Sequence, residues 1–201
     1  MIPVAPRREG AGSLRIASGT LRGRKIRTPP GGATRPLLTR IRKSLVDILR
    51  PRLPMARVLD LFGGSGAVTF ELLSNGATEA VLVEIDTETS RLIRESAHQL
   101  GISACVINAD ALHAIPRLSA AGERFDVILI APPYGQSLQQ LTLDALAEHG
   151  LLASRGMVVI QRDSKEPLCQ LGTDPTFRHV GSRRYGRTAF DFYVGTEEPG
   201  G

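Results

Sequence analysis

RVLDLFGGSG, residues 57–66, is the stretch of sequence that decides the fold. A short apolar run typical of a buried strand ends at Asp60 and passes directly into glycines and a helix-like segment. Glycines at such a turn let the main chain approach a ligand closely, and the amides of the helix N-terminus point at that ligand. The stretch therefore predicts a cofactor-binding turn in an α/β protein, with a purely structural turn as the alternative.

The chain after this stretch alternates short β-branched runs with amphipathic segments. Helices are expected near residues 65–76, 87–100, 111–119 and 137–149, and the strands between them end in VEID (83–86), NADA (108–111) and APPY (131–134). This alternation predicts a mostly parallel sheet with helices on both faces. Residues 178–195 differ, because two strand-like runs flank Tyr185-Gly186-Arg187 and predict a closing antiparallel hairpin.

The first 57 residues are strongly basic. They hold 14 Lys and Arg against two acidic residues, a net charge of +12, whereas the remaining 144 residues carry a net charge of −7. Of the 25 basic residues 22 are Arg, whose planar guanidinium suits phosphate contacts. The segment predicts a polyanionic partner, with a solvated basic tail as the alternative.

Three parts are expected along the chain. Residues 1–13, rich in Gly, Pro and Arg, predict a disordered tail. Residues 14–55 predict a small basic extension, a hairpin followed by an amphipathic helix that presents Arg40, Arg42 and Lys43 outward. Residues 56–196 form the expected α/β domain.

Acidic residues stand at the expected strand ends. Asp60 directly before the glycines favours a ligand with a cationic amino group over a pyrophosphate, and Thr69 stands where the dinucleotide fingerprint requires Gly or Ala. Glu84 is placed to accept from ribose hydroxyls, whereas Asp86 is better placed to cap the next helix. Asp110 is a candidate acceptor for an adenine amino group or an ordinary helix cap.

The sequence APPY offers a site for a planar base. Two consecutive prolines fix the backbone and remove two N–H groups, which leaves carbonyls facing the crevice at the carboxyl end of the sheet. Tyr134 follows at once and can stack on a base whose amino group meets those carbonyls. The alternative is a rigid turn with a packing tyrosine.

Composition excludes other classes of protein. A chain of 201 residues with 42% apolar content supports one core, and we expect neither a membrane span nor a signal peptide but a soluble cytoplasmic protein. Cys105 and Cys169 have no CxxC spacing and no nearby His cluster, so we expect reduced thiols and no metal site.

These residues resemble a known family. DLFGGSGAV, VEID, NADA and APPY, in this order, resemble the four principal motifs of class I methyltransferases that act on exocyclic amino groups. Residues 15–19, 22–25, 35–36 and 40–45 resemble the N-terminal signature of the RsmD family, the 16S ribosomal RNA guanine-N2 methyltransferases. The similarity runs from about Leu14 to Tyr134, and Arg184-Tyr185-Gly186 with Thr188 fits the family's closing hairpin.

The resemblance implies a Rossmann-like seven-strand sheet, S-adenosylmethionine as cofactor, and a monomer that acts on 16S rRNA in the small ribosomal subunit. The implied cofactor-binding residues are Asp60, Phe62, Gly63, Gly64, Ser65, Gly66, Glu84, Ile85, Asp110 and Ala111. The implied catalytic segment is Ala131, Pro132, Pro133 and Tyr134. The implied RNA-binding residues are Arg15, Arg22, Arg24, Lys25, Arg35, Arg40 and Arg42.

One position departs from the family pattern. Ala131 stands where Asp or Asn is usual, and alanine has no side-chain acceptor to orient the poorly nucleophilic amine. Four explanations stay open: the carbonyls of Ala131 and Pro132 suffice, another residue substitutes, the enzyme is slow, or its target differs.

Three other functions are alternatives to guanine-N2 methylation. The first is methylation of an adenine amino group in RNA or DNA, and the second is a weakly active or non-catalytic rRNA-binding assembly factor, which Ala131 favours. The third is a nicotinamide-dependent oxidoreductase, which the poor match to the dinucleotide fingerprint disfavours.

Overall fold

The computed structural model describes residues 12–29, 37–135, 137–172 and 176–196. Among these residues, no helix is long and apolar enough to cross a membrane. Cys105 is exposed and Cys169 is half-buried, and neither forms a disulfide among these residues.

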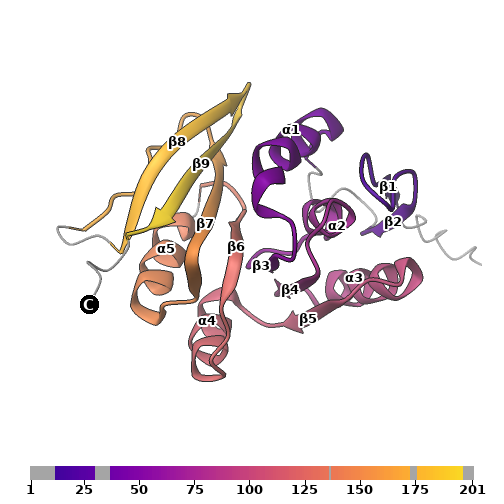
Figure 1. The fold of residues 1–201 in the computed structure, drawn as a ribbon, viewed down its shortest axis with the longest axis horizontal. Coiled ribbons are helices and arrows are strands. Elements are labelled where there is room, and N and C mark those ends of the chain that lie inside the picture. Colours follow the sequence, from indigo (N-terminus) through magenta and orange to yellow (C-terminus); the bar gives the residue numbers. More distant parts are fainter. Residues whose placement is uncertain (1–11, 30–36, 136, 173–175, 197–201) are drawn as a thin grey trace, which may run out of the picture.

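A seven-stranded sheet forms the centre of the molecule, in the order β5-β4-β3-β6-β7-β9-β8 (Figure 1). The strands are β3 (Arg57–Asp60), β4 (Glu79–Glu84), β5 (Ala104–Asn108), β6 (Phe125–Ile130), β7 (Leu152–Asp163), β8 (Phe177–Tyr185) and β9 (Thr188–Gly195). Neighbouring strands from β5 to β7 pair in parallel, and β9 pairs antiparallel with both β7 and β8. The predicted Rossmann-like sheet with a closing hairpin is therefore confirmed.

Helices cover both faces of this sheet. They are α1 (Thr39–Leu49), α2 (Ala67–Ser74), α3 (Thr87–Leu100), α4 (Ala111–Ala120) and α5 (Leu138–His149), and the short 3-10 helix η2 (Arg50–Arg52) follows α1. Buried residues of α1, α2 and α3 pack in one cluster with Val58 and Leu129, and those of α4 and α5 pack in another with Leu59 and Ile128. The strand order reverses beside β3, where the connections leave in opposite directions, so a ligand crevice is expected at the carboxyl ends of β3 and β6.

The N-terminal hairpin consists of β1 (Gly12–Arg15) and β2 (Lys25–Thr28), which pair antiparallel. Its first strand begins at Gly12, two residues before the expected boundary, and residues 1–11 of the expected disordered tail lie outside the described residues. The hairpin lies beside α2 and α3 (Figure 1). Ile16 and Ile26 belong to the same buried cluster as Val58, so the extension shares the core of the α/β domain.

Candidate functional site

A cavity of about 1010 Å³ lies at the carboxyl ends of the central strands. Every predicted cofactor-binding residue except Gly66 lines it, and so do all four residues of the APPY segment. The structure therefore brings together two groups of residues that the sequence places up to 74 positions apart, from Asp60 to Tyr134. Gly66 instead begins α2 as its N-cap residue.

The glycine turn after β3 is fixed to the end of β4. Gly64 and Gly66 have φ angles of 52° and 72°, a region that favours glycine. Gly63 N donates to Val83 O at 2.8 Å, and Gly64 N donates to Glu84 Oε2 at 2.7 Å. These bonds hold the turn against the strand that carries the second acidic residue.

Glu84 joins the glycine turn after β3 to the loop after β4. Its Oε2 accepts from Gly64 N, and its Oε1 accepts from Asp86 N at 2.9 Å. Each carboxylate oxygen has a second lone pair, so the side chain can accept further hydrogen bonds from ligand hydroxyls in the cavity. Asp86 caps α3 by accepting from Thr89 N at 2.7 Å, the role that the sequence favours for it.

Asp60 is a buried carboxylate in the wall of the cavity. It is 4% exposed, and it accepts from Phe62 N at 3.2 Å and from Thr69 Oγ1 at 2.7 Å. Burial raises the pKa of Asp60 to about 6, although these hydrogen bonds lower it, and the nearby charge of Glu84 adds to the rise. None of the described Lys, Arg or His side chains forms an ion pair with Asp60. The carboxylate thus suits a ligand that brings its own positive charge.

Asp110 both caps α4 and lines the cavity. Its Oδ1 accepts from Leu112 N at 2.8 Å and from His113 N at 3.3 Å. Both of these cap bonds use Oδ1, and the side chain remains 42% exposed. The cap geometry is therefore compatible with a second role as acceptor for a ligand.

The APPY segment ends in a tethered aromatic ring. Pro132 is buried, whereas Tyr134 is 37% exposed. Tyr134 Oη accepts from Gln161 Nε2 at 3.2 Å and lies 3.5 Å from Thr188 Oγ1. The ring is thus held between β7 and the start of β9 at the cavity wall, where a planar ligand can meet it.

The sequence analysis missed part of the wall of the cavity. Leu37, Leu45 and Arg42 reach it from the N-terminal extension, and Gln161 and Phe190 reach it from β7 and β9. Leu45 falls within residues 40–45 of the family signature without an implied role at the cofactor, and Gln161 carries no motif. The pairing of β6 with β7, which is a tertiary property, brings Gln161 to the APPY segment, where it contacts Tyr134.

The predicted RNA-binding residues lie mainly on the surface. Arg15, Arg22, Arg24, Lys25 and Arg40 are exposed. Arg15 donates to Gly23 O at 2.8 Å, and Arg24 donates to Gln99 O at 3.1 Å, so both side chains are partly ordered. Arg35 lies outside the described residues.

Arg42 is a correction to the sequence analysis. It does not point outward from α1 but is 1% exposed, with its Nε 3.5 Å from Glu71 Oε1. Its guanidinium also donates to Leu37 O at 2.7 Å and to Arg15 O at 3.0 Å. The side chain joins the hairpin to α2 inside the core, so it has no free surface for an RNA phosphate.

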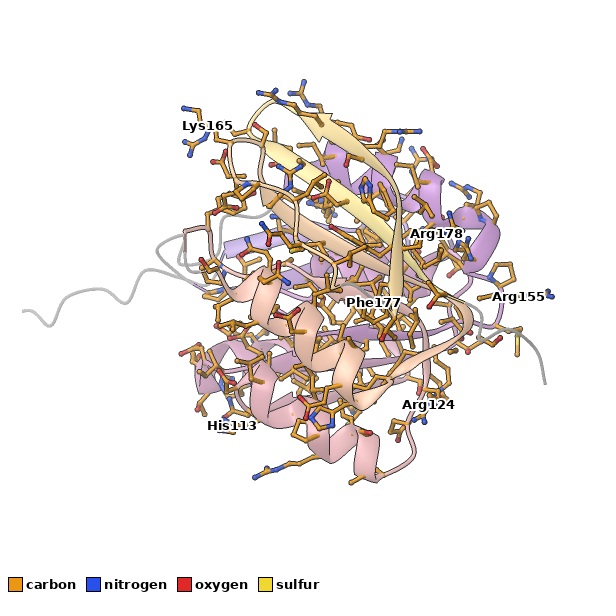
Figure 2. All side chains as sticks on the ribbon, turned by 90° about the vertical axis from the view of Figure 1, so that its left-hand side faces the viewer. His113, Arg124, Arg155, Lys165, Phe177 and Arg178 are labelled. Carbon is orange, nitrogen blue, oxygen red and sulfur yellow. The ribbon has the colours of Figure 1, made fainter. Side chains whose placement is uncertain are left out.

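The closing hairpin adds basic residues that the sequence analysis did not assign to RNA. Arg183, Arg184 and Arg187 are exposed around the β8–β9 turn. Tyr185 Oη lies 2.5 Å from Ser44 Oγ, so this turn meets α1 (Figure 1). Lys165 projects from the same end of the molecule, whereas His113 and Arg124 lie at the opposite end (Figure 2).

Comparisons with known proteins identify the family. The family model described as Conserved hypothetical protein 95 matches residues 14–194. Ribosomal RNA small subunit methyltransferase D of Escherichia coli K12 is 32% identical over 164 residues, 81% of each chain.

Two solved structures are also similar. One is a putative methyltransferase, yhhF, of Escherichia coli, with a TM-score of 0.81 and 25% identity over 93% of this chain and 100% of that one. The other is a hypothetical protein of Thermus thermophilus, with a TM-score of 0.76 and 38% identity over 89% of this chain and 98% of that one. By its motifs, its sheet and these matches, the chain belongs to the RsmD family of class I methyltransferases.

Proposed function

We propose that this protein transfers a methyl group from S-adenosylmethionine to the exocyclic N2 amine of a guanine in 16S rRNA. The observation that carries the proposal is the cavity that joins the acidic strand ends to the APPY segment. The name of the Escherichia coli relative, which specifies small-subunit ribosomal RNA, supports this class of substrate.

The acidic residues fit the cofactor part by part. Asp60, a buried carboxylate without a cationic partner among the described residues, would hold the amino group of the methionine moiety. Glu84 would accept from the ribose hydroxyls, and Asp110 from the adenine amino group. When bound, S-adenosylmethionine would supply a methyl group on a cationic sulfur. The amine lone pair would form the N–C bond, the S–C electron pair would stay on sulfur, and one amine proton would leave to solvent.

The APPY segment fits the target base. Tyr134 offers an exposed ring for stacking, and its hydroxyl contacts to Gln161 and Thr188 limit its rotation. The lone pair of a conjugated amine is delocalised into its ring, so the amine reacts only when acceptors hold it in the correct direction. The carbonyls of Ala131 and Pro132 are the main-chain candidates for this role.

Two basic surfaces would contact the RNA backbone. One consists of Arg15, Arg22, Arg24 and Lys25 on the hairpin and Arg40 on α1, and the other consists of Arg183, Arg184 and Arg187 at the β8–β9 turn. The contact between Ser44 and Tyr185 places the second surface beside α1, and that between Tyr134 and Thr188 places it close to the cavity. Phosphate contacts on both sides would position the target nucleotide over Tyr134.

The test is the modification state of 16S rRNA in cells without this gene. We expect digestion and mass spectrometry to show the loss of one N2-methylguanosine, which returns fully with the wild-type gene and to a smaller extent with the Asp60→Asn variant. Loss of N6-methyladenosine instead would identify an adenine amino group as the target. Complete 16S rRNA modification together with defective subunit assembly would identify a non-catalytic assembly factor, the function that Ala131 favours.

A further inference from the structure

Ala131 has a polar neighbour on the next strand. β6 and β7 pair in parallel with Leu129 opposite Val159 and Ile130 opposite Ile160, which is the last pair of the ladder. Ala131 directly follows Ile130 at the end of β6, and Gln161 directly follows Ile160 within β7. Residues opposite each other in parallel strands share one face of the sheet. Leu129 and Val159, two positions earlier, lie together in the buried cluster beneath α1. Ala131 and Gln161, two positions further along, therefore lie on the same face of the sheet as Leu129 and Val159, and both line the cavity.

The carboxamide of Gln161 is already oriented. Its Nε2 donates to Tyr134 Oη at 3.2 Å, in a half-buried position on the cavity wall. Among the described residues, no group donates to its Oε1. On the other side Gln161 pairs with Phe190 of β9, which is 2% exposed, so the side chain stands between a packed apolar wall and the stacking tyrosine.

We infer that Gln161 supplies the side-chain acceptor that Ala131 lacks, with its Oε1 accepting a hydrogen bond from the target amine. This inference rests on the proposed function and names the residue that positions the base for it. In the family pattern, either Asp or Asn stands at the position of Ala131. Because the Asn carboxamide is not a base, the role requires only a hydrogen-bond acceptor. A carboxamide oxygen meets that requirement from the adjacent strand.

The same bonds form and break as in the proposed reaction. The Gln161 oxygen accepts a hydrogen bond from one N–H of the amine, and this bond favours a pyramidal nitrogen whose lone pair leaves conjugation with the ring and is directed at the methyl group. The proton that leaves after transfer goes to water, because a carboxamide does not take it up. Gln161 is thus a positioning group that touches the substrate without changing its own protonation state.

The experiment is single-turnover methyl transfer by the full-length protein to small subunits that lack the modification. We expect Gln161→Leu, which keeps the size and removes the acceptor, to lower the transfer rate roughly 100-fold while cofactor affinity stays constant. Gln161→Glu keeps an acceptor, so its transfer rate should stay within about 10-fold of the wild-type rate. Ala131→Asp added to Gln161→Leu should restore most of the rate, an effect that a structural role of Gln161 does not predict.

Tyr134→Phe is the matched control, because it removes the hydroxyl that Gln161 contacts and keeps the stacking ring. Tyr134→Phe keeps the Gln161 acceptor and removes only the bond that orients it, so its loss of rate should be smaller than that of Gln161→Leu. An equal loss in the two variants would show that Gln161 acts only through Tyr134 and would overturn the inference. A wild-type rate in Gln161→Leu, or a loss in Gln161→Glu as large as in Gln161→Leu, would also overturn it. So would a gain of more than about 10-fold from Ala131→Asp alone, because Gln161 would then not fill the role.

The wild type is measured first and tests the proposed function separately. Transfer to an adenine amine would refute the guanine target but leave the acceptor test valid, because that amine has the same requirement. No transfer by the wild type, with cofactor and subunit both bound, would refute the proposed function and the acceptor with it.

Discussion

Asp60→Asn should make the fold more stable and at the same time weaken cofactor binding. Burial raises the Asp60 pKa from 3.8 to about 6, and each unit corresponds to about 1.4 kcal/mol, so the charged carboxylate costs the fold about 3 kcal/mol above pH 6. This cost is absent below the unfolded pKa of 3.8 and grows as the pH rises to 6. Asparagine has nearly the same shape, and Thr69 Oγ1 can reverse its hydrogen bond to meet the new amide.

We therefore expect Asp60→Asn to raise the free energy of unfolding by up to about 3 kcal/mol at pH 8, and by about half of that at pH 5. S-adenosylmethionine should bind at least 10-fold more weakly, because its amino group loses its ionic partner. A hydrogen bond to a charged group contributes about 1.5–3 kcal/mol. Urea denaturation at both pH values and calorimetry measure the two effects, with the exposed Asp47→Asn as control. Equal stability of the variant and the wild type at pH 8, or unchanged cofactor affinity, would refute the reasoning.

Three further predictions concern the extension, the hairpin and the stacking ring. Arg42→Ala should lower the free energy of unfolding, measured by urea denaturation, by about 3–5 kcal/mol because it leaves Glu71 buried without an ionic partner. The exposed Arg40→Ala should change it by less than about 0.5 kcal/mol. Equal effects of the two substitutions would show that the buried ion pair does not stabilise the fold. The double substitution Arg183→Ser and Arg184→Ser should weaken RNA binding and leave cofactor affinity unchanged. The slope of log affinity against log salt concentration should fall by about one unit per lost phosphate contact. An unaltered slope would show that the hairpin does not contact the RNA. Tyr134→Ala should weaken binding of the target nucleoside by about 1–3 kcal/mol and Tyr134→Phe should not, and similar affinities of the two variants would argue against stacking.

The sequence predicted most of the fold because its signals are local. The strand ends at Asp60, Glu84 and Asn108, and the helix over residues 87–100, follow from apolar periodicity and from capping residues a few positions away. The acidic residues could also be placed at one edge, because parallel strands bring their carboxyl ends together.

The missed features depend on contacts between distant segments. Arg42 lies three, four and seven residues before Leu45, Val46 and Leu49, on the buried side of α1, but its partner Glu71 belongs to another helix. The approach of the β8–β9 turn to α1 follows from the strand order, and the position of Gln161 beside Ala131 follows from the register of β6 and β7. Neither strand order nor register is encoded in one segment of the chain.

The most direct test of the proposed function is methyl transfer with purified components. Purified protein, S-adenosylmethionine with a labelled methyl group, and small ribosomal subunits that lack the modification are mixed, and the RNA is digested to nucleosides. We predict that the label appears in N2-methylguanosine, at a rate that Asp60→Asn lowers. No label in any nucleoside, although cofactor and subunit both bind, would contradict the proposed function.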